Sequence, residues 1–146
     1  VMGVSTAAGA RWRLTAPLFA DQRVSPDDVS YQTLIRIPLG TVLLEEILFR
    51  GVLPAYLESE ASYYDVKSSV VFGLWHMLPT LNTLDINSVE QPAVRLGAVA
   101  AAVATTTGVG LGFGWLRGRT GSLLAPALIH WAANAFAYVV AARRQS

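Results

Sequence analysis

Cysteine is absent from this chain of 146 residues. A disulfide, a thiolate nucleophile and a cysteine-ligated zinc site are therefore excluded. Charge is scarce too, because Asp, Glu, Lys and Arg make up 14% of the sequence and leave a net charge of +1. No basic run is longer than Arg143–Arg144, so no nucleic-acid partner is expected.

Apolar residues are abundant instead. They make up 53% of the chain, and the mean hydropathy is +0.42. Both values exceed those of typical soluble domains. Period-two alternation, which would indicate a membrane β-barrel, is missing. We therefore predict an all-α, polytopic membrane helix bundle.

Four hydrophobic segments approach the roughly 20 residues that a membrane-spanning helix needs. They are residues 37–57, 68–84, 96–116 and 121–142. Pro79 is expected to kink or end the second helix, and the glycines of TTGVGLGFGW predict close packing of the third. A soluble protein with a buried helical core is the alternative, but three near-continuous apolar spans in a short chain disfavour it.

The chain divides into two parts on this interpretation. Residues 1–33 form an N-terminal segment, with the end of an upstream helix and a loop, and residues 34–146 form the core of a larger membrane protein. If all four segments span, most arginines lie on one side and Lys67, Arg117 and Arg119 on the other. The positive-inside rule then predicts cytoplasmic termini.

Three charged residues interrupt the first span, in the stretch TVLLEEILFRGVL. Charges inside a span cost a few kcal/mol each on insertion scales, so they usually face a bundle interior and serve a function. Glu46 and Arg50 are four residues apart, with the acid first, which favours an ion pair on one helix face. Glu45 points about 100° away from Glu46 and is expected to remain available for chemistry.

Two further helices carry one histidine each. FGLWH places Phe72 and His76 on one face, and HWAAN does the same for His130 and Asn134. Either histidine alone is more often a packing residue. However, Glu45, His76 and His130 each lie roughly 12–14 Å from the start of their segment, which brings them to one level in an antiparallel bundle. This arrangement indicates an intramembrane hydrolytic site.

Two hydrolytic mechanisms fit these residues. In the first, Glu45 and His76 activate a water molecule while His130 and Asn134 stabilise the oxyanion, and no cofactor is required. In the second, Glu45, His76 and His130 hold a zinc ion. The usual zinc-protease signature, H-E-x-x-H, is missing, so the metal-free mechanism is favoured and zinc stays open.

The same three stretches resemble the motifs of a known family. EEILFR fits EExxxR, FGLWH fits FxxxH, and HWAAN fits a histidine followed four residues later by Asn or Asp. Their order and spacing resemble the CPBP family of intramembrane proteases, also called Abi, which includes the type II CAAX prenyl endopeptidases and bacteriocin-processing proteins. The resemblance covers residues 37–138.

This resemblance implies a glutamate-dependent endopeptidase, often termed a metalloprotease, that cuts membrane-associated substrates, prenylated CAAX-type proteins among them. The catalytic set would be Glu45, His76, His130 and Asn134, in chain order. Glu46 and Arg50 would form a supporting ion pair, and Phe72 would serve packing. The expected partners are membrane lipids and a membrane-bound protein or peptide, and the expected location is the cell membrane of a prokaryote.

Two other functions use the same residues. A non-catalytic immunity or scaffold protein of the same fold would have no physical reason to keep the complete buried polar set. A proton-coupled transporter would use the acids and histidines as a relay, but four spans leave little room for two alternating gates. The endopeptidase is therefore the preferred hypothesis.

Overall fold

The computed structural model describes residues 25–57 and 66–143. Every regular element within these two ranges is a helix, as predicted. In chain order they are Pro26–Asp28 (η1), Val29–Tyr31 (α2), Gln32–Val42 (η2), Leu43–Glu46 (α3), Ile47–Val52 (η3), Leu53–Tyr56 (α4), Val66–Trp75 (α5), Met77–Ile86 (α6), Pro92–Thr120 (α7) and Leu124–Ala142 (α8). The predicted end of an upstream helix at the N-terminus lies outside the described residues.

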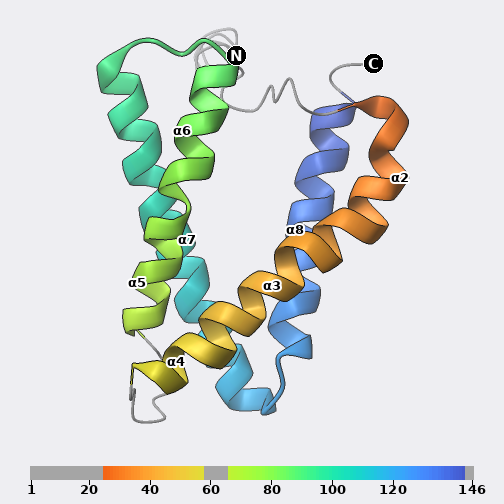
Figure 1. Cartoon of the computed structure of the whole chain (residues 1–146), viewed down its shortest axis with the longest axis vertical. Helices are drawn as coiled ribbons and strands as arrows, with labels where there is room; N and C mark the ends of the chain where they lie inside the picture. The colour runs from red at the N-terminus through yellow and green to blue at the C-terminus, as the bar shows by residue number, and fades with distance from the viewer. Residues whose placement is uncertain (1–24, 58–65, 144–146) are drawn as a thin grey trace, which may run out of the picture.

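The first six elements follow one another without interruption and form a single N-terminal rod, residues 26–56 (Figure 1). The predicted span 37–57 is the second part of this rod. In η2 and η3 the backbone hydrogen bonds bridge five residues instead of four, for example from the Leu43 N–H to the Pro38 carbonyl. Such wide turns are uncommon in proteins and often accompany functional sites.

Pro38 explains how the rod is tied to α8. Proline has no N–H, so it leaves a carbonyl one turn earlier without its helical donor. With five-residue spacing this carbonyl belongs to Thr33, and the Trp131 Nε1–H of α8 donates to it at 2.6 Å. A neighbouring helix thus satisfies the freed group, as a membrane interior requires.

Pro54 ties the rod to α5 in the same way. Five residues before it lies Phe49, whose carbonyl accepts a hydrogen bond from the Ser68 hydroxyl. Both partners are buried, since Phe49 is 3% exposed and Ser68 is 2% exposed. The carbonyls released by the two prolines therefore join the rod by hydrogen bonds to α8 at Thr33 and to α5 at Phe49.

The second predicted span is broken between α5 and α6, at His76. Pro79 accounts for the break, because its ring would collide with the carbonyl of Trp75, four residues earlier, in a continuous helix. The His76 N–H instead reaches the Gly73 carbonyl, three residues back, at 3.1 Å. The predicted kink is confirmed, and it falls on a predicted site residue.

The last two helices are long and apolar enough to cross a membrane. α7 begins with Pro92, which suits a first helical position, and it ends at Gly121, whose φ of 65° is the left-handed conformation that glycine adopts easily. The Leu124 N–H at the start of α8 donates to the Ser122 hydroxyl oxygen at 3.1 Å. The chain is an all-α membrane helix bundle.

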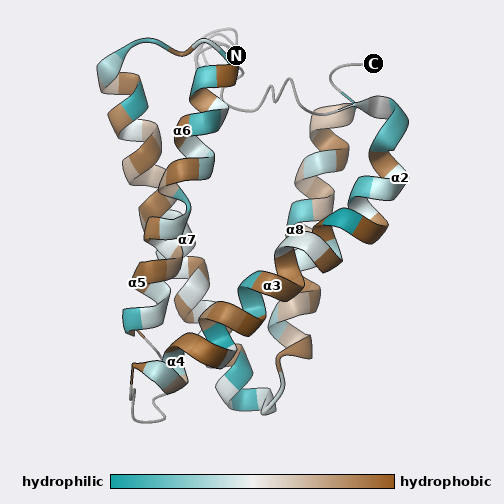
Figure 2. Ribbon diagram, viewed as in Figure 1, coloured by the Kyte–Doolittle hydropathy of each residue, from teal (hydrophilic) through white to brown (hydrophobic). Residues whose placement is uncertain are grey.

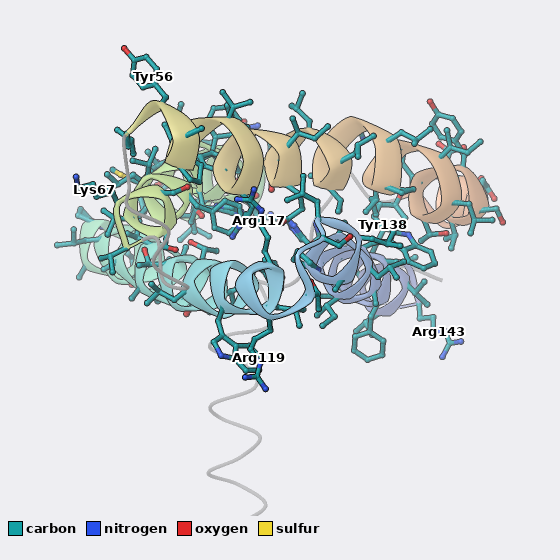
Figure 3. The ribbon with its side chains drawn as sticks, turned by 90° about the horizontal axis from the view of Figure 1, so that it is seen from below. Tyr56, Lys67, Arg117, Arg119, Tyr138 and Arg143 are labelled. Atoms are coloured by element: carbon teal, nitrogen blue, oxygen red, sulfur yellow. The ribbon has the colours of Figure 1, made fainter. Side chains whose placement is uncertain are left out.

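Figure 1 shows α5 and α6 beside α7, while the rod runs diagonally across α8. Hydrophobic residues recur along every helix (Figure 2), and many large ones are exposed; Leu78, Leu96 and Phe136 are at least 70% exposed. Arg119 and Arg143 point away from the bundle (Figure 3). An apolar outer surface of this kind suits contact with lipid chains.

Candidate active site

Two adjacent glutamates of α3 are buried at the centre of the bundle. Glu45 is 7% exposed and Glu46 is 1% exposed. Because a buried carboxylate is costly without partners, their hydrogen bonds decide what each can do. The two carboxylates have different partners.

Glu46 is held on two sides. Its Oε1 atom lies 3.2 Å from Nη1 of Arg50, one turn along the rod, and 2.8 Å from Nδ1 of His130 on α8. The Arg50 guanidinium lies over the ring of Phe72, 4.0 Å from its centroid, and 5.1 Å from that of Phe113. These aromatic faces add cation–π attraction to the ion pair.

Like Glu46, whose Oε2 atom is also unpaired in the described ranges, Glu45 keeps one oxygen without a hydrogen bond. Its Oε1 atom accepts a hydrogen bond from the Trp75 indole at 3.2 Å. Its Oε2 atom is buried, faces Nε2 of His130 at 3.7 Å, and has no hydrogen-bond partner within residues 25–57 and 66–143. At 3.7 Å the contact is too long for a direct hydrogen bond.

Trp75 was missed as a site residue in the sequence. The signal was present, because a tryptophan in a membrane helix carries an N–H that needs an acceptor when its ring is partly buried. The Trp75 ring also packs edge-on against Phe49, with centroids 5.9 Å apart. The indole thus joins α5 to both Glu45 and the rod.

His130 lies between the two glutamates. One ring nitrogen contacts Glu46 and the other faces Glu45. The ring centroids of Phe113 and Phe72 lie 5.3 Å and 6.0 Å away. The sequence suggested that Glu45 is left without a counter-charge once Arg50 pairs with Glu46, but here an imidazole adjoins both acids.

His76 stands at the break between α5 and α6. Its Nδ1 atom lies 2.8 Å from the Phe72 carbonyl. A carbonyl only accepts, so Nδ1 carries the proton of this hydrogen bond, and Nε2 of the neutral ring is left as an acceptor. Within the described ranges α5 contacts Glu45 through Trp75, not through His76. The pairing of His76 with Glu45 therefore stays a prediction.

Asn134 lies one turn beyond His130 on α8 and is half-buried. In the part of the chain that the structure describes, it forms no hydrogen bond with Glu45, Glu46 or His130. Its contact with an oxyanion, which only a bound substrate can provide, therefore stays a prediction.

The zinc alternative needs three ligands within reach of one ion. Within residues 25–57 and 66–143, no group of three His, Asp or Glu side chains is placed to hold a metal ion. Glu45 and His130 face each other, but in the described residues no third carboxylate or imidazole is placed to share an ion with them. As they are placed, these residues do not fit zinc.

An apolar groove of about 290 Å³ opens between η2 and α8, next to the cluster formed by Glu45, Glu46, Arg50 and His130. Its lining consists of Leu34, Pro38, Leu39, Val42, Leu43, Ala127, Leu128 and Trp131. Val42 precedes Glu46 by four residues and Ala127 precedes His130 by three, so the groove lies about one turn from the site. None of the lining residues is charged.

Comparison with known proteins supplies the family. Residues 29–136 match the sequence model described as type II CAAX prenyl endopeptidase Rce1-like. The chain belongs to the Rce1-like family. This membership implies CAAX-type intramembrane protease activity in general and a membrane-associated protein as substrate. Neither the curated proteins nor the solved structures contain a match to the chain.

Proposed function

We propose that the chain is the core of a glutamate-dependent intramembrane endopeptidase, in which Glu45 activates the water that attacks a peptide carbonyl. One observation carries this proposal. Glu45 is buried, one of its oxygens is held by Trp75, and the other is unpaired within the described residues and faces His130. A buried carboxylate oxygen with an open hydrogen-bonding position is suited to accept a proton from water.

The Oε2 atom of Glu45 and the Nε2 atom of His130 are 3.7 Å apart, a separation that one water molecule bridges with two hydrogen bonds once the site opens, because Oε2 is buried in this structure. Glu45 accepts one proton of this water as the water oxygen bonds to the substrate carbonyl carbon. We propose that His76, whose Nε2 atom is an acceptor when Nδ1 donates to the Phe72 carbonyl, is the partner of Glu45 in activating this water.

The oxyanion that forms needs hydrogen-bond donors. We assign this role to His130, once Nε2 carries a proton, and to Asn134, whose amide lies one turn further along α8. Glu46 and Arg50 support the arrangement because their ion pair fixes the helix that carries Glu45. No step is assigned to a metal ion.

For the substrate we propose a CAAX-type protein with an isoprenoid chain next to the scissile bond. The groove between η2 and α8 supports this choice, because its lining is apolar and it lies about one turn from Glu46 and His130. An isoprenoid chain there would bury apolar surface while the peptide reaches Glu45.

We also propose that the protein lies in a prokaryotic cell membrane with both termini cytoplasmic. Figure 1 shows the start of α5, which holds Lys67, and the end of α7, which holds Arg117 and Arg119, at one end of the bundle. The start of α7, which holds Arg95, and the end of α8, which Arg143 follows, lie at the other. Counted along the sequence as four spans, the side that carries the greater number of arginines faces the cytoplasm by the positive-inside rule.

The test is cleavage of a membrane-tethered reporter by Glu45→Gln. We expect kcat to fall by about 100-fold or more, because a positioned acid or base typically contributes about 10²–10⁴ in rate. Glu90→Gln is the matched control, since Glu90 is exposed and lies between α6 and α7. Cleavage by Glu45→Gln at the unmutated rate would contradict the proposal and favour a non-catalytic protein of the same fold.

A further inference from the structure

The contact between Glu46 and His130 specifies where one proton lies. The Glu46 Oε1 atom and the His130 Nδ1 atom are 2.8 Å apart, in a place where Glu46 is 1% exposed and His130 is 6% exposed. The same oxygen accepts from Arg50, a group that only donates. A carboxylate oxygen used in this way accepts from the imidazole as well, so the proton of this contact is on Nδ1.

We propose that Glu46 is a positioning residue that fixes the tautomer of His130, a role beyond its ion pair with Arg50. With the proton on Nδ1, the Nε2 atom of the neutral ring is the one that faces Glu45. Phe113 and Phe72 pack against the ring, which restricts its rotation. Glu46 thus determines which nitrogen of His130 reaches the reacting atoms.

The consequence for the reaction rests on the proposed function. As the oxygen of water bonds to the carbonyl carbon, its proton moves to Oε2 of Glu45. The Glu45 carboxyl then moves to close the 3.7 Å gap to Nε2 of His130 and passes this proton to it, and His130 donates to the oxyanion. As the carbon–nitrogen bond breaks, the same proton moves to the leaving amine nitrogen. Glu45 returns to its carboxylate form and His130 to its neutral form.

Glu46 takes no part in these transfers and does not contact the substrate. Its contribution is to keep Nδ1 of His130 occupied, so that Nε2 is free to receive the proton. An imidazole with its single proton on Nε2 could donate to the oxyanion but could not accept from Glu45. The tautomer therefore decides whether the transfer can take place.

The chain is well suited to a direct test, because it contains only two histidines. We suggest labelling the full chain with ¹⁵N-histidine in lipid nanodiscs and reading the two imidazoles by NMR, with His76→Gln to assign them. The expected result is a proton on Nδ1 of His130 in the unmutated chain. A His130 ring whose Nδ1 carries no proton would overturn the proposal without any variant being needed.

Glu46→Gln should then move part of the His130 population to the tautomer with the proton on Nε2, because an amide no longer requires a donor at Nδ1. His76 is an internal control, since its Nδ1 faces a backbone carbonyl that the substitution leaves unchanged. Arg50→Lys is the matched control: it perturbs the ion pair and leaves the carboxylate beside Nδ1. A His130 spectrum that changes equally in Glu46→Gln and Arg50→Lys would contradict the role given to Glu46.

Activity supplies the second measurement. We expect Glu46→Gln to lower kcat by about 100-fold with KM nearly unchanged, and Glu46→Asp, which keeps the charge, to lose less. If Glu45→Gln is inactive while Glu46→Gln keeps full kcat, this inference fails and the proposed function stands. If Glu45→Gln cleaves at the unmutated rate, the proposed function fails, whereas the NMR result still decides the tautomer.

Discussion

Two walls of the bundle pack in different ways. In the first, formed by α5 and α7, a Cβ atom on Gly73 would lie 2.0 Å from the Thr107 hydroxyl oxygen and 2.8 Å from the Val103 carbonyl oxygen. In the second, formed by η2 and α8, the hydrogen bond from Trp131 to Thr33 joins two helices that leave an apolar groove beside it. The α5–α7 wall is thus close-packed, and the η2–α8 wall is open.

The charged cluster shows why the walls differ. Arg50 lies against Phe72 of α5 and Phe113 of α7, and a Cβ atom on Gly110 would come within 3.3 Å of its Nη2 atom. A buried ion pair tolerates little displacement, because breaking it leaves an uncompensated charge. The tight wall holds this pair, and on the proposed function the open wall admits the substrate.

The largest effect is expected from Gly73→Ala. The added methyl group would meet a backbone carbonyl, which cannot rotate away, so α5 and α7 must separate. We expect the free energy of unfolding to fall by about 3 kcal/mol, at the upper end for overpacked cores. Reversible unfolding in mixed micelles, followed by circular dichroism, measures this change.

Gly108→Ala on α7 is the control, since a Cβ atom there would have nothing within 4 Å. It should leave stability unchanged or raise it by up to about 1 kcal/mol through helix propensity. Equal losses for Gly73→Ala and Gly108→Ala would show that the α5–α7 wall is no tighter than the rest of the bundle.

The next effect belongs to Ser68→Ala. This substitution removes the donor to the buried Phe49 carbonyl, which Pro54 has already deprived of its helical partner. An unsatisfied buried carbonyl costs about 1–3 kcal/mol, and the same unfolding measurement applies. Ser30→Ala, at an exposed serine of the rod, is the control. A loss in Ser68→Ala no greater than in Ser30→Ala would mean that another group satisfies the carbonyl.

The open wall is tested by Ala127→Leu, which places a larger side chain in the groove. Stability should change little, because the groove has space. If a lipid chain loses the burial of about one methylene, near 0.8 kcal/mol, KM for a prenylated reporter rises about fourfold at constant kcat. Ala101→Leu, at an exposed position of α7, is the control. A parallel KM rise for a peptide without a lipid chain would argue against lipid binding in the groove.

Much of the fold could be predicted from the sequence. The apolar runs predicted α7 to within four residues at each end and α8 to within three, because composition indicates a long membrane helix. Pro79 predicted the break at His76 for a local steric reason. The five-residue turns of the rod were not predictable in this way, since they depend on Ser68 and Trp131 donating to the carbonyls that two prolines release.

In the candidate site, too, some contacts could be predicted from the sequence and others could not. The ion pair of Glu46 and Arg50 follows from their spacing on one helix. The contact between Glu46 and His130 joins residues 84 positions apart, so no local pattern reveals it. Motif spacing assigned His76 to Glu45, whereas the contact from α5 to Glu45 comes from Trp75. Spacing along a helix determines which residues share a face, and the packing of the helices determines which residues meet.

The smallest effect is expected from Trp131→Phe, which separates the contribution of ring packing from that of the hydrogen bond between η2 and α8. The substitution keeps an aromatic ring beside the groove and removes the N–H that donates to the Thr33 carbonyl. The hydrogen bond from Trp131 is only part-buried, whereas that from Ser68 is buried. Hydrogen bonds between membrane helices contribute about 0.6 kcal/mol on average, so stability should fall by about this amount, well below the loss in Ser68→Ala. Trp115→Phe controls for the loss of an indole, since Trp115 is exposed on α7 beside Arg119. A loss in Trp131→Phe as large as that in Gly73→Ala would mean that one hydrogen bond makes the open wall as firm as the tight one. The contrast between the two walls would then have to be abandoned.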